Sequence, residues 1–123
     1  MSESPRILSV GQCGLDGPRI KRHLESTFDA KVVTADSVAD ATDELEGGQF
    51  DLVMVNRILD ATGEEGQQVI KVAVEKGQTA MLVSNFDDAQ EKAVAAGAKP
   101  GFGKAKLGSD DADAKIKAAL GIG

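Results

Sequence analysis

The sequence predicts an α/β domain in which five parallel strands alternate with five helices. Five short apolar runs are separated by five segments whose apolar residues recur at helical spacing. Two of the runs, 52–55 and 80–83, show no polar alternation, which is typical of central parallel strands that are covered on both faces. Strict alternation of this kind favours a parallel sheet with helices on both sides.

Three strands and two helices are predicted in the first half of the chain. The strands cover residues 7–10, 31–35 and 52–55. The first helix is marked by apolar residues at four-residue spacing, Ile20, Leu24 and Phe28. The second helix begins after Asp36 or Ser37, because either side chain can accept a capping hydrogen bond. The glycine pair 47–48 ends this helix.

The second half of the chain continues the alternation. The third helix is marked by Val69, Ile70, Ala73 and Val74, and it is followed by the strand 80–83. Asp87 and Asp88 suit the first turn of a fourth helix, where the helix dipole favours negative charge. Residues 101–103 are a weak fifth strand, and Ser109 or Asp110 caps a last helix.

Length and composition indicate a single small domain that spans residues 1–123. The formal net charge of −6 argues against binding of a nucleic-acid backbone. The one cysteine, Cys13, cannot form an internal disulfide, and no apolar run approaches the length of a membrane helix. We therefore expect a cytoplasmic protein that binds neither membranes nor nucleic acids.

The predicted sheet brings a defined set of residues to one edge. Ligands of parallel α/β sheets bind outside the carboxyl ends of the strands. Gly11 and Gln12 follow the first strand, Asn56 the third, Ser84 the fourth and Lys104 the fifth. These five residues are the candidate site.

The order and spacing of the five strands and of these five positions resemble the receiver domains of two-component response regulators. The resemblance implies a flavodoxin-like, doubly wound (βα)5 sheet of strand order 2-1-3-4-5. It also implies a degenerate phosphorylation site. Gly11 and Gln12 stand where the family has an acidic pair, and Asn56 stands where it has the phospho-accepting aspartate. Ser84 and Lys104 match the family's pattern, although Ala105 replaces the proline that commonly follows the lysine.

These departures predict a receiver-like domain that cannot be phosphorylated. An asparagine amide cannot act as the nucleophile that a carboxylate provides. Mg²⁺ is held through carboxylates and waters, and Gly11, Gln12 and Asn56 carry no formal charge. Asp16 and Asp60 are near in sequence, but we expect them to stay outside the crevice. The prediction is a stand-alone pseudo-receiver that is not an enzyme, binds no Mg²⁺ or cofactor, and acts as a phosphorylation-independent protein-interaction module in bacterial signalling.

The resemblance also implies a surface for the protein partner. In the family, the fourth helix, fifth strand and fifth helix commonly form it. The corresponding residues here are Asp88, Lys92, Phe102, Lys106 and Lys115. The family's switch aromatic aligns with Gly101, one residue before Phe102, and a one-residue shift turns a strand side chain to the other face. We therefore expect Phe102 to pack in the core.

Other functions remain open from the sequence. Cys13 and Arg19 have the C-x5-R spacing of the phosphate loop in low-molecular-weight tyrosine phosphatases, a resemblance that implies a phosphate-handling enzyme. A second alternative is a small-anion or nucleotide sensor, because Lys104 is expected to lack a charged neighbour in the crevice. Gly14, Gly17 and Gly63 match a dinucleotide-binding fingerprint poorly in order and spacing.

Overall fold

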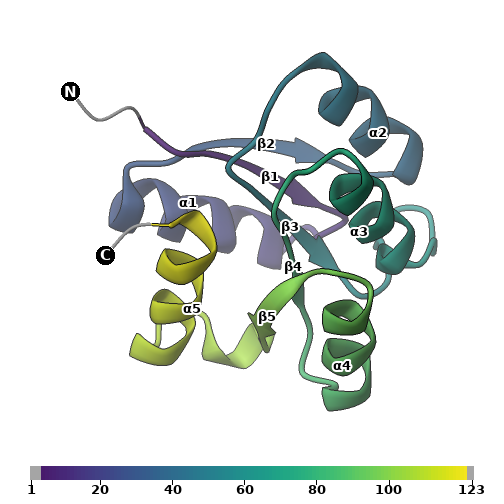
Figure 1. The fold of residues 1–123 in the computed structure, drawn as a ribbon. Helices are drawn as coiled ribbons and strands as arrows, with labels where there is room; N and C mark the ends of the chain where they lie inside the picture. Colours follow the sequence, from purple (N-terminus) through teal and green to yellow (C-terminus); the bar gives the residue numbers. More distant parts are fainter. Residues whose placement is uncertain (1–3, 122–123) are drawn as a thin grey trace.

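The computed structural model describes residues 4–121 and contains one five-stranded parallel sheet. The strands are β1 (Arg6–Val10), β2 (Lys31–Ala35), β3 (Leu52–Asn56), β4 (Ala80–Val83) and β5 (Lys99–Phe102). They lie in the order β2-β1-β3-β4-β5, and every neighbouring pair is parallel (Figure 1). The predicted fold class and strand order are confirmed.

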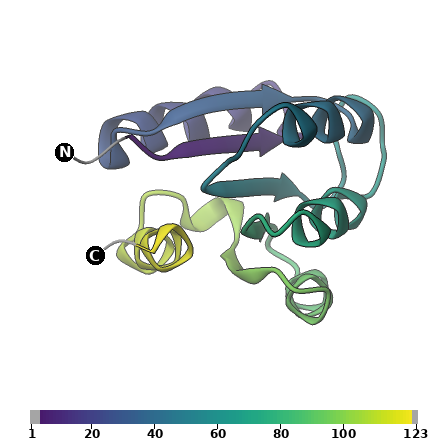
Figure 2. The same cartoon turned by 45° about the horizontal axis from the view of Figure 1, so that its top comes forward.

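Five α-helices cover the two faces of the sheet. They are α1 (Asp16–Phe28), α2 (Val38–Gly47), α3 (Gly66–Glu75), α4 (Asp87–Ala95) and α5 (Asp110–Leu120). Helices α1 and α5 lie on one face, and α2, α3 and α4 lie on the other (Figure 2). A short 3-10 helix, η1 (Lys104–Lys106), follows β5 and was not predicted. None of the helices in residues 4–121 is long and apolar enough to cross a membrane.

The core consists of two aliphatic layers that the sheet separates. Leu8 and Val10 of β1 pack toward α2 and α3, whereas Ile7 packs toward α1. All five residues of β3 are buried, which agrees with the absence of polar alternation in this run. Phe102 is 3% exposed and belongs to the layer under α1 and α5, so its predicted core position is confirmed.

Two helix caps follow the sequence signals, whereas one strand boundary does not. The Ser37 hydroxyl accepts a hydrogen bond from the Asp40 amide at 3.0 Å, and the Ser109 hydroxyl accepts one from the Ala112 amide at 3.2 Å. Strand β5 begins at Lys99, two residues earlier than predicted, and ends at Phe102. Its first two residues are exposed and lie in an edge strand, where proline is tolerated, so they lack an apolar signal.

Gln90 fastens α4 to the edge of the sheet. Its side-chain amide donates to the Leu82 carbonyl at 2.9 Å and to the Ser84 carbonyl at 3.1 Å. Its Oε1 accepts a hydrogen bond from the Gly101 amide at 3.2 Å. A Cβ atom at Gly101 would collide with the Leu82 carbonyl oxygen, so this position of β5 admits no side chain. Helix α4 is thereby fixed to both β4 and β5.

Candidate functional site

Three of the five candidate residues line one cavity at the carboxyl edge of the sheet. Asn56, Ser84 and Lys104 surround a crevice of about 290 Å³ between the ends of β3, β4 and β5. Gly11 reaches the same place through its backbone, because its carbonyl accepts a hydrogen bond from the Asn56 amide. Gln12 does not belong to this crevice. It lines a separate cavity between β1, β2 and α1.

The Asn56 side chain is a structural hydrogen-bonding group. It is 6% exposed, and its Nδ2 donates to the Gly11 carbonyl at 3.0 Å and to the Ile58 carbonyl at 2.8 Å. Its Oδ1 accepts a hydrogen bond from the Arg57 amide at 3.0 Å. The side chain therefore ties the loop after β1 to the loop after β3. Both contacts of Nδ2 require a donor, which a carboxylate cannot supply.

Lys104 has a charged neighbour, contrary to expectation. Its Nζ lies 3.4 Å from Asp16 Oδ2, so the lysine has an ionic partner. Asp16 is the first residue of α1, and it is not among the described residues that line the crevice. Asp60 does line the crevice, so the expectation that it stays outside is wrong. Its side chain is exposed, and its backbone amide donates to the Gly11 carbonyl at 3.0 Å.

Asp16 is the centre of a small polar cluster. Its carboxylate accepts a hydrogen bond from the Cys13 thiol at 3.3 Å and pairs with Arg19 at 3.3 Å. The side chain is 18% exposed. Burial acts to raise the pKa of the Asp16 carboxyl, but the Cys13 hydrogen bond and the charges of Lys104 and Arg19 outweigh it, so the pKa lies below its usual value. The carboxylate is ionised at neutral pH.

The same cluster bears on the phosphatase-like spacing of Cys13 and Arg19. In such a phosphate loop the thiolate and the guanidinium would both face an open anion cradle. Here both side chains contact the Asp16 carboxylate. A phosphate group would have to displace a negative charge from this position.

Two further residues complete the crevice: Arg57, whose place directly after a predicted strand marks it for inspection, and Phe86, which the sequence did not single out. The Arg57 guanidinium lies 4.6 Å from the centroid of the Phe86 ring, and both residues line the cavity. Phe86 is 59% exposed, and its backbone amide donates to the Ser84 hydroxyl at 3.1 Å. Arg57 follows the end of β3 by one position and Phe86 follows the end of β4 by three, and this placement is the only signal that the sequence carried for them.

The described residues offer no cluster for a metal ion. Within residues 4–121 there is no group of three or more His, Cys, Asp or Glu side chains that could hold one. The nearest carboxylate to Lys104 is that of Asp16, whose interactions with Lys104, Arg19 and Cys13 are described above.

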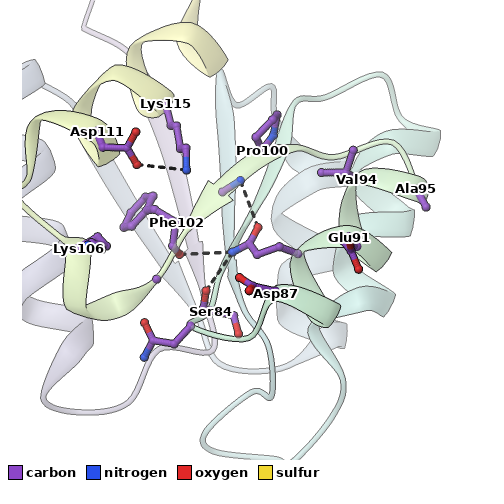
Figure 3. Close-up of a pocket in the computed structure, with 14 residues that line it drawn as sticks. Ser84, Asp87, Glu91, Val94, Ala95, Pro100, Phe102, Lys106, Asp111 and Lys115 are labelled. Carbon is purple, nitrogen blue, oxygen red and sulfur yellow. Dashed lines mark hydrogen bonds and ion pairs between the residues drawn. The ribbon is translucent and has the colours of Figure 1, made fainter.

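A larger groove, of about 710 Å³, lies between α4, β5 and α5 (Figure 3). It includes Phe102, Lys106 and Lys115 of the partner surface implied by the resemblance. Asp88 and Lys92 lie on α4 but outside the lining of this groove, as the described residues define it. The groove also contains Glu91, Val94 and Pro100, which the sequence did not single out.

Comparisons with known proteins locate the fold among receiver domains. No family model matches the sequence, and no curated protein matches it. The structure is similar to a CheY-like response regulator receiver domain protein from Methanospirillum hungatei, with a TM-score of 0.80, 21% identity, and coverage of 97% of this chain and 95% of that one. A two-component response regulator from Clostridium difficile aligns with a TM-score of 0.77, 19% identity, and coverage of 95% and 96%. The Francisella response regulator 1452 receiver domain aligns with a TM-score of 0.76, 11% identity, and coverage of 96% and 98%. The chain therefore has the receiver-domain fold.

Proposed function

We propose that this protein is a pseudo-receiver: a signalling module of the response-regulator type that acts through protein contacts and without phosphorylation. The observation that carries the proposal is the use of Asn56. This side chain aligns with the phospho-accepting aspartate of receiver domains. Its amide donates to two backbone carbonyls and accepts a hydrogen bond from one backbone amide. A side chain in this role holds loops together and offers no nucleophile.

The electrostatics of the crevice support the same proposal. Phosphoryl transfer in receivers depends on a divalent cation, and Mg²⁺ binds through carboxylates and waters. Gly11 contributes a carbonyl that is already bonded to Asn56, and Gln12 faces another cavity. The Asp16 carboxylate is paired with Lys104 and Arg19, so its charge is compensated within the protein.

The output surface of the module is proposed to be the groove between α4, β5 and α5. Gln90 fixes α4 to β4 and β5, and Gly101 leaves no room for a switching aromatic side chain. Both features support a surface that does not depend on phosphorylation for its shape. We place such a module in the cytoplasm.

The chemistry of the groove indicates what a protein partner must offer. Val94 and Pro100 supply exposed apolar surface, and the buried Phe102 lies beneath the groove (Figure 3). Acidic side chains of α4 lie on one side, Asp87 and Glu91. Lys106 lies on the other side, and Lys115 pairs with Asp111 at 3.2 Å. A partner segment with an apolar centre and charges of both signs fits this arrangement.

Exposure to a small-molecule phosphodonor tests the proposal. The full chain is incubated with acetyl phosphate and Mg²⁺, and the intact mass is measured. We expect no phosphorylated species, whereas an active receiver domain treated in parallel gains one phosphoryl group. A phosphorylated wild-type chain whose modification maps to the crevice would refute the proposal.

A further inference from the structure

A cavity of about 420 Å³ lies between the carboxyl ends of β1 and β2 and the start of α1, separate from the Asn56 crevice. This volume falls within the range of small-molecule pockets in proteins. Ser9 of β1 and Thr34 of β2 are neighbours in the sheet register, and both line the cavity. Because side chains alternate across a strand, Ser9 points to the same face as Ile7, which packs toward α1. The sheet therefore contributes two neighbouring hydroxyl-bearing side chains to the cavity.

Three polar atoms of the residues that line this cavity are buried without a hydrogen-bond partner. Among residues 4–121, they are Ser9 Oγ and the Gln12 atoms Oε1 and Nε2. Ser9 is 2% exposed, so its hydroxyl cannot turn to bulk water. Buried polar groups in proteins are nearly always paired with protein, water or a ligand. A hydroxyl and a carboxamide that lack partners therefore indicate a guest that offers both donors and acceptors.

Rotation of the Gln12 side chain can present its carboxamide to the cavity. Gln12 as a whole is half-buried and lines the cavity, whereas its amide atoms are shielded from solvent. Within residues 4–121 no hydrogen bond holds these atoms in place, and the terminal torsion of a glutamine side chain is broad. Turning the amide toward a guest therefore breaks no hydrogen bond in the described part of the chain.

The walls of the cavity favour an uncharged guest. Two charged residues line it, Lys21 and Asp36, and they are exposed and opposite in sign. The start of α1 offers little to an anion, because the Asp16 amide donates to Cys13 Sγ and Pro18 has no amide hydrogen. The Asp16 carboxylate in the same turn further opposes negative charge.

We propose that this cavity binds a small uncharged molecule that carries a primary carboxamide. A carboxamide presents an N–H donor beside a C=O acceptor, which is the complement of Gln12 Nε2 and Oε1. Two parallel hydrogen bonds would join the two amides, a two-point contact that glutamine also makes with the donor–acceptor edge of adenine. The Ser9 hydroxyl would donate to the second lone pair of the guest carbonyl. The small residues Gly14, Gly17 and Ala35 leave room in the cavity for the rest of the molecule.

Titration of the isotope-labelled full chain with benzamide, followed by amide NMR, tests this proposal. We expect saturable shifts confined to residues 9–18 and 34–36 and to the side-chain amide signals of Gln12, with a dissociation constant of about 1 mM. Acetophenone keeps the ring and the carbonyl but has no N–H donor, and benzoate replaces the amide by a charged group. Each should bind at least about tenfold more weakly than benzamide.

Two variants separate the contributions of the two side chains. Gln12→Met removes both amide atoms and should weaken benzamide binding by at least about tenfold. Gln68→Met is the matched control, because Gln68 is exposed on α3 and does not line the cavity, and its affinity should stay within about twofold. Ser9→Ala should weaken binding by about threefold. Neither Gln12→Met nor Ser9→Ala should lower the urea midpoint of unfolding, because the atoms that they remove have no partner within residues 4–121.

Three results would overturn the proposal. Benzamide gives no saturable response at these residues, as expected if water alone fills the cavity. Acetophenone or benzoate binds as tightly as benzamide, which would show that the amide is not recognised. Gln12→Met leaves the benzamide affinity unchanged, which would show that Gln12 is not the contact.

Discussion

Two hollows lie at the carboxyl edge of the sheet, and they differ in how their polar groups are used. In the crevice beside Asn56, the amide, the Ser84 hydroxyl and the Lys104 ammonium all have partners within the protein. In the cavity beside Gln12, the carboxamide and the Ser9 hydroxyl have none within the described chain, residues 4–121. Asn56, Ser84 and Lys104 are thus paired within the protein, whereas the neighbouring cavity contains buried polar atoms that have no partner within residues 4–121.

This difference shows that position in a fold does not by itself identify a binding site. Both hollows occupy places where α/β proteins bind ligands. The two sites differ in how many of their polar groups already have hydrogen-bond partners. A paired group gains little binding free energy from a ligand, whereas an unpaired buried group gains much. The predictions below alter the groups that hold the Asn56 crevice and the neighbouring α4 surface in place.

The largest effect is expected at Gly11, where the family's acidic pair would begin. A side chain here must adopt φ of +71° and would collide with Leu59. Gly11→Asp should therefore lower the free energy of unfolding by about 3 to 5 kcal/mol. Chemical denaturation measures the loss, and Gly14→Ala, which has open space and an ordinary φ, should change stability far less. Comparable losses in the two variants would show that Gly11 is not sterically constrained.

Asn56→Asp should destabilise the fold although it introduces the residue type that the resemblance to receiver domains implies at this position. The carboxylate would face the Gly11 and Ile58 carbonyls without a proton to donate, at a cost of about 2 to 4 kcal/mol near neutral pH. The deficit should shrink in acid, where the introduced carboxyl takes up a proton and can donate again. Asn85→Asp is the control, because Asn85 is exposed and only accepts a hydrogen bond, from the Ala105 amide. A variant as stable as wild type at neutral pH would mean that the Asn56 amide bonds are dispensable.

Gln90→Ala should loosen the output surface. It removes the hydrogen bonds to Leu82 and Ser84 and the one from Gly101, which we expect to cost about 2 to 3 kcal/mol. Amide exchange in α4 and β5 should accelerate more than in α1. Gln67→Ala, which removes a single 3.3 Å bond to the Ala89 carbonyl, should have a smaller effect. Unchanged exchange in α4 would show that Gln90 does not fix the surface.

Asp16→Asn should have the smallest effect, about 1 kcal/mol, since the Lys104 and Arg19 pairs are only partly buried. Because the pKa of Asp16 is lowered in the folded state, its contribution is present above the unfolded pKa and is lost as pH falls through the folded one. The variant should therefore lose less stability than wild type on acidification below about pH 4. Asp111→Asn, which breaks a more exposed pair, is the control. Identical acid profiles for Asp16→Asn and wild type would contradict this role.

Local signals in the sequence predicted most of the fold, but not the direction of the site's side chains. The parallel sheet follows from the alternation, whereas the strand order came from the resemblance to receiver domains. The caps at Ser37 and Ser109 depend only on residues three positions away. The Asp16–Lys104 pair joins the start of α1 to the start of η1, and no periodicity encodes such a contact. Its place after the first strand and the resemblance to receiver domains predict Gln12 in the crevice, yet the loop directs it into the other cavity.

The central claim is that the Asn56 crevice binds neither a phosphoryl group nor its metal ion. It is tested most directly by amide NMR of the full chain titrated with Mg²⁺ and then with beryllofluoride, which mimics a phosphorylated aspartate. Spectra unchanged around residues 11, 56, 84 and 104 are the result we predict, because the side chains of Asn56, Ser84 and Lys104 each have a partner in the protein. Saturable, Mg²⁺-dependent shifts at these residues, abolished by Asn56→Ala, would contradict it.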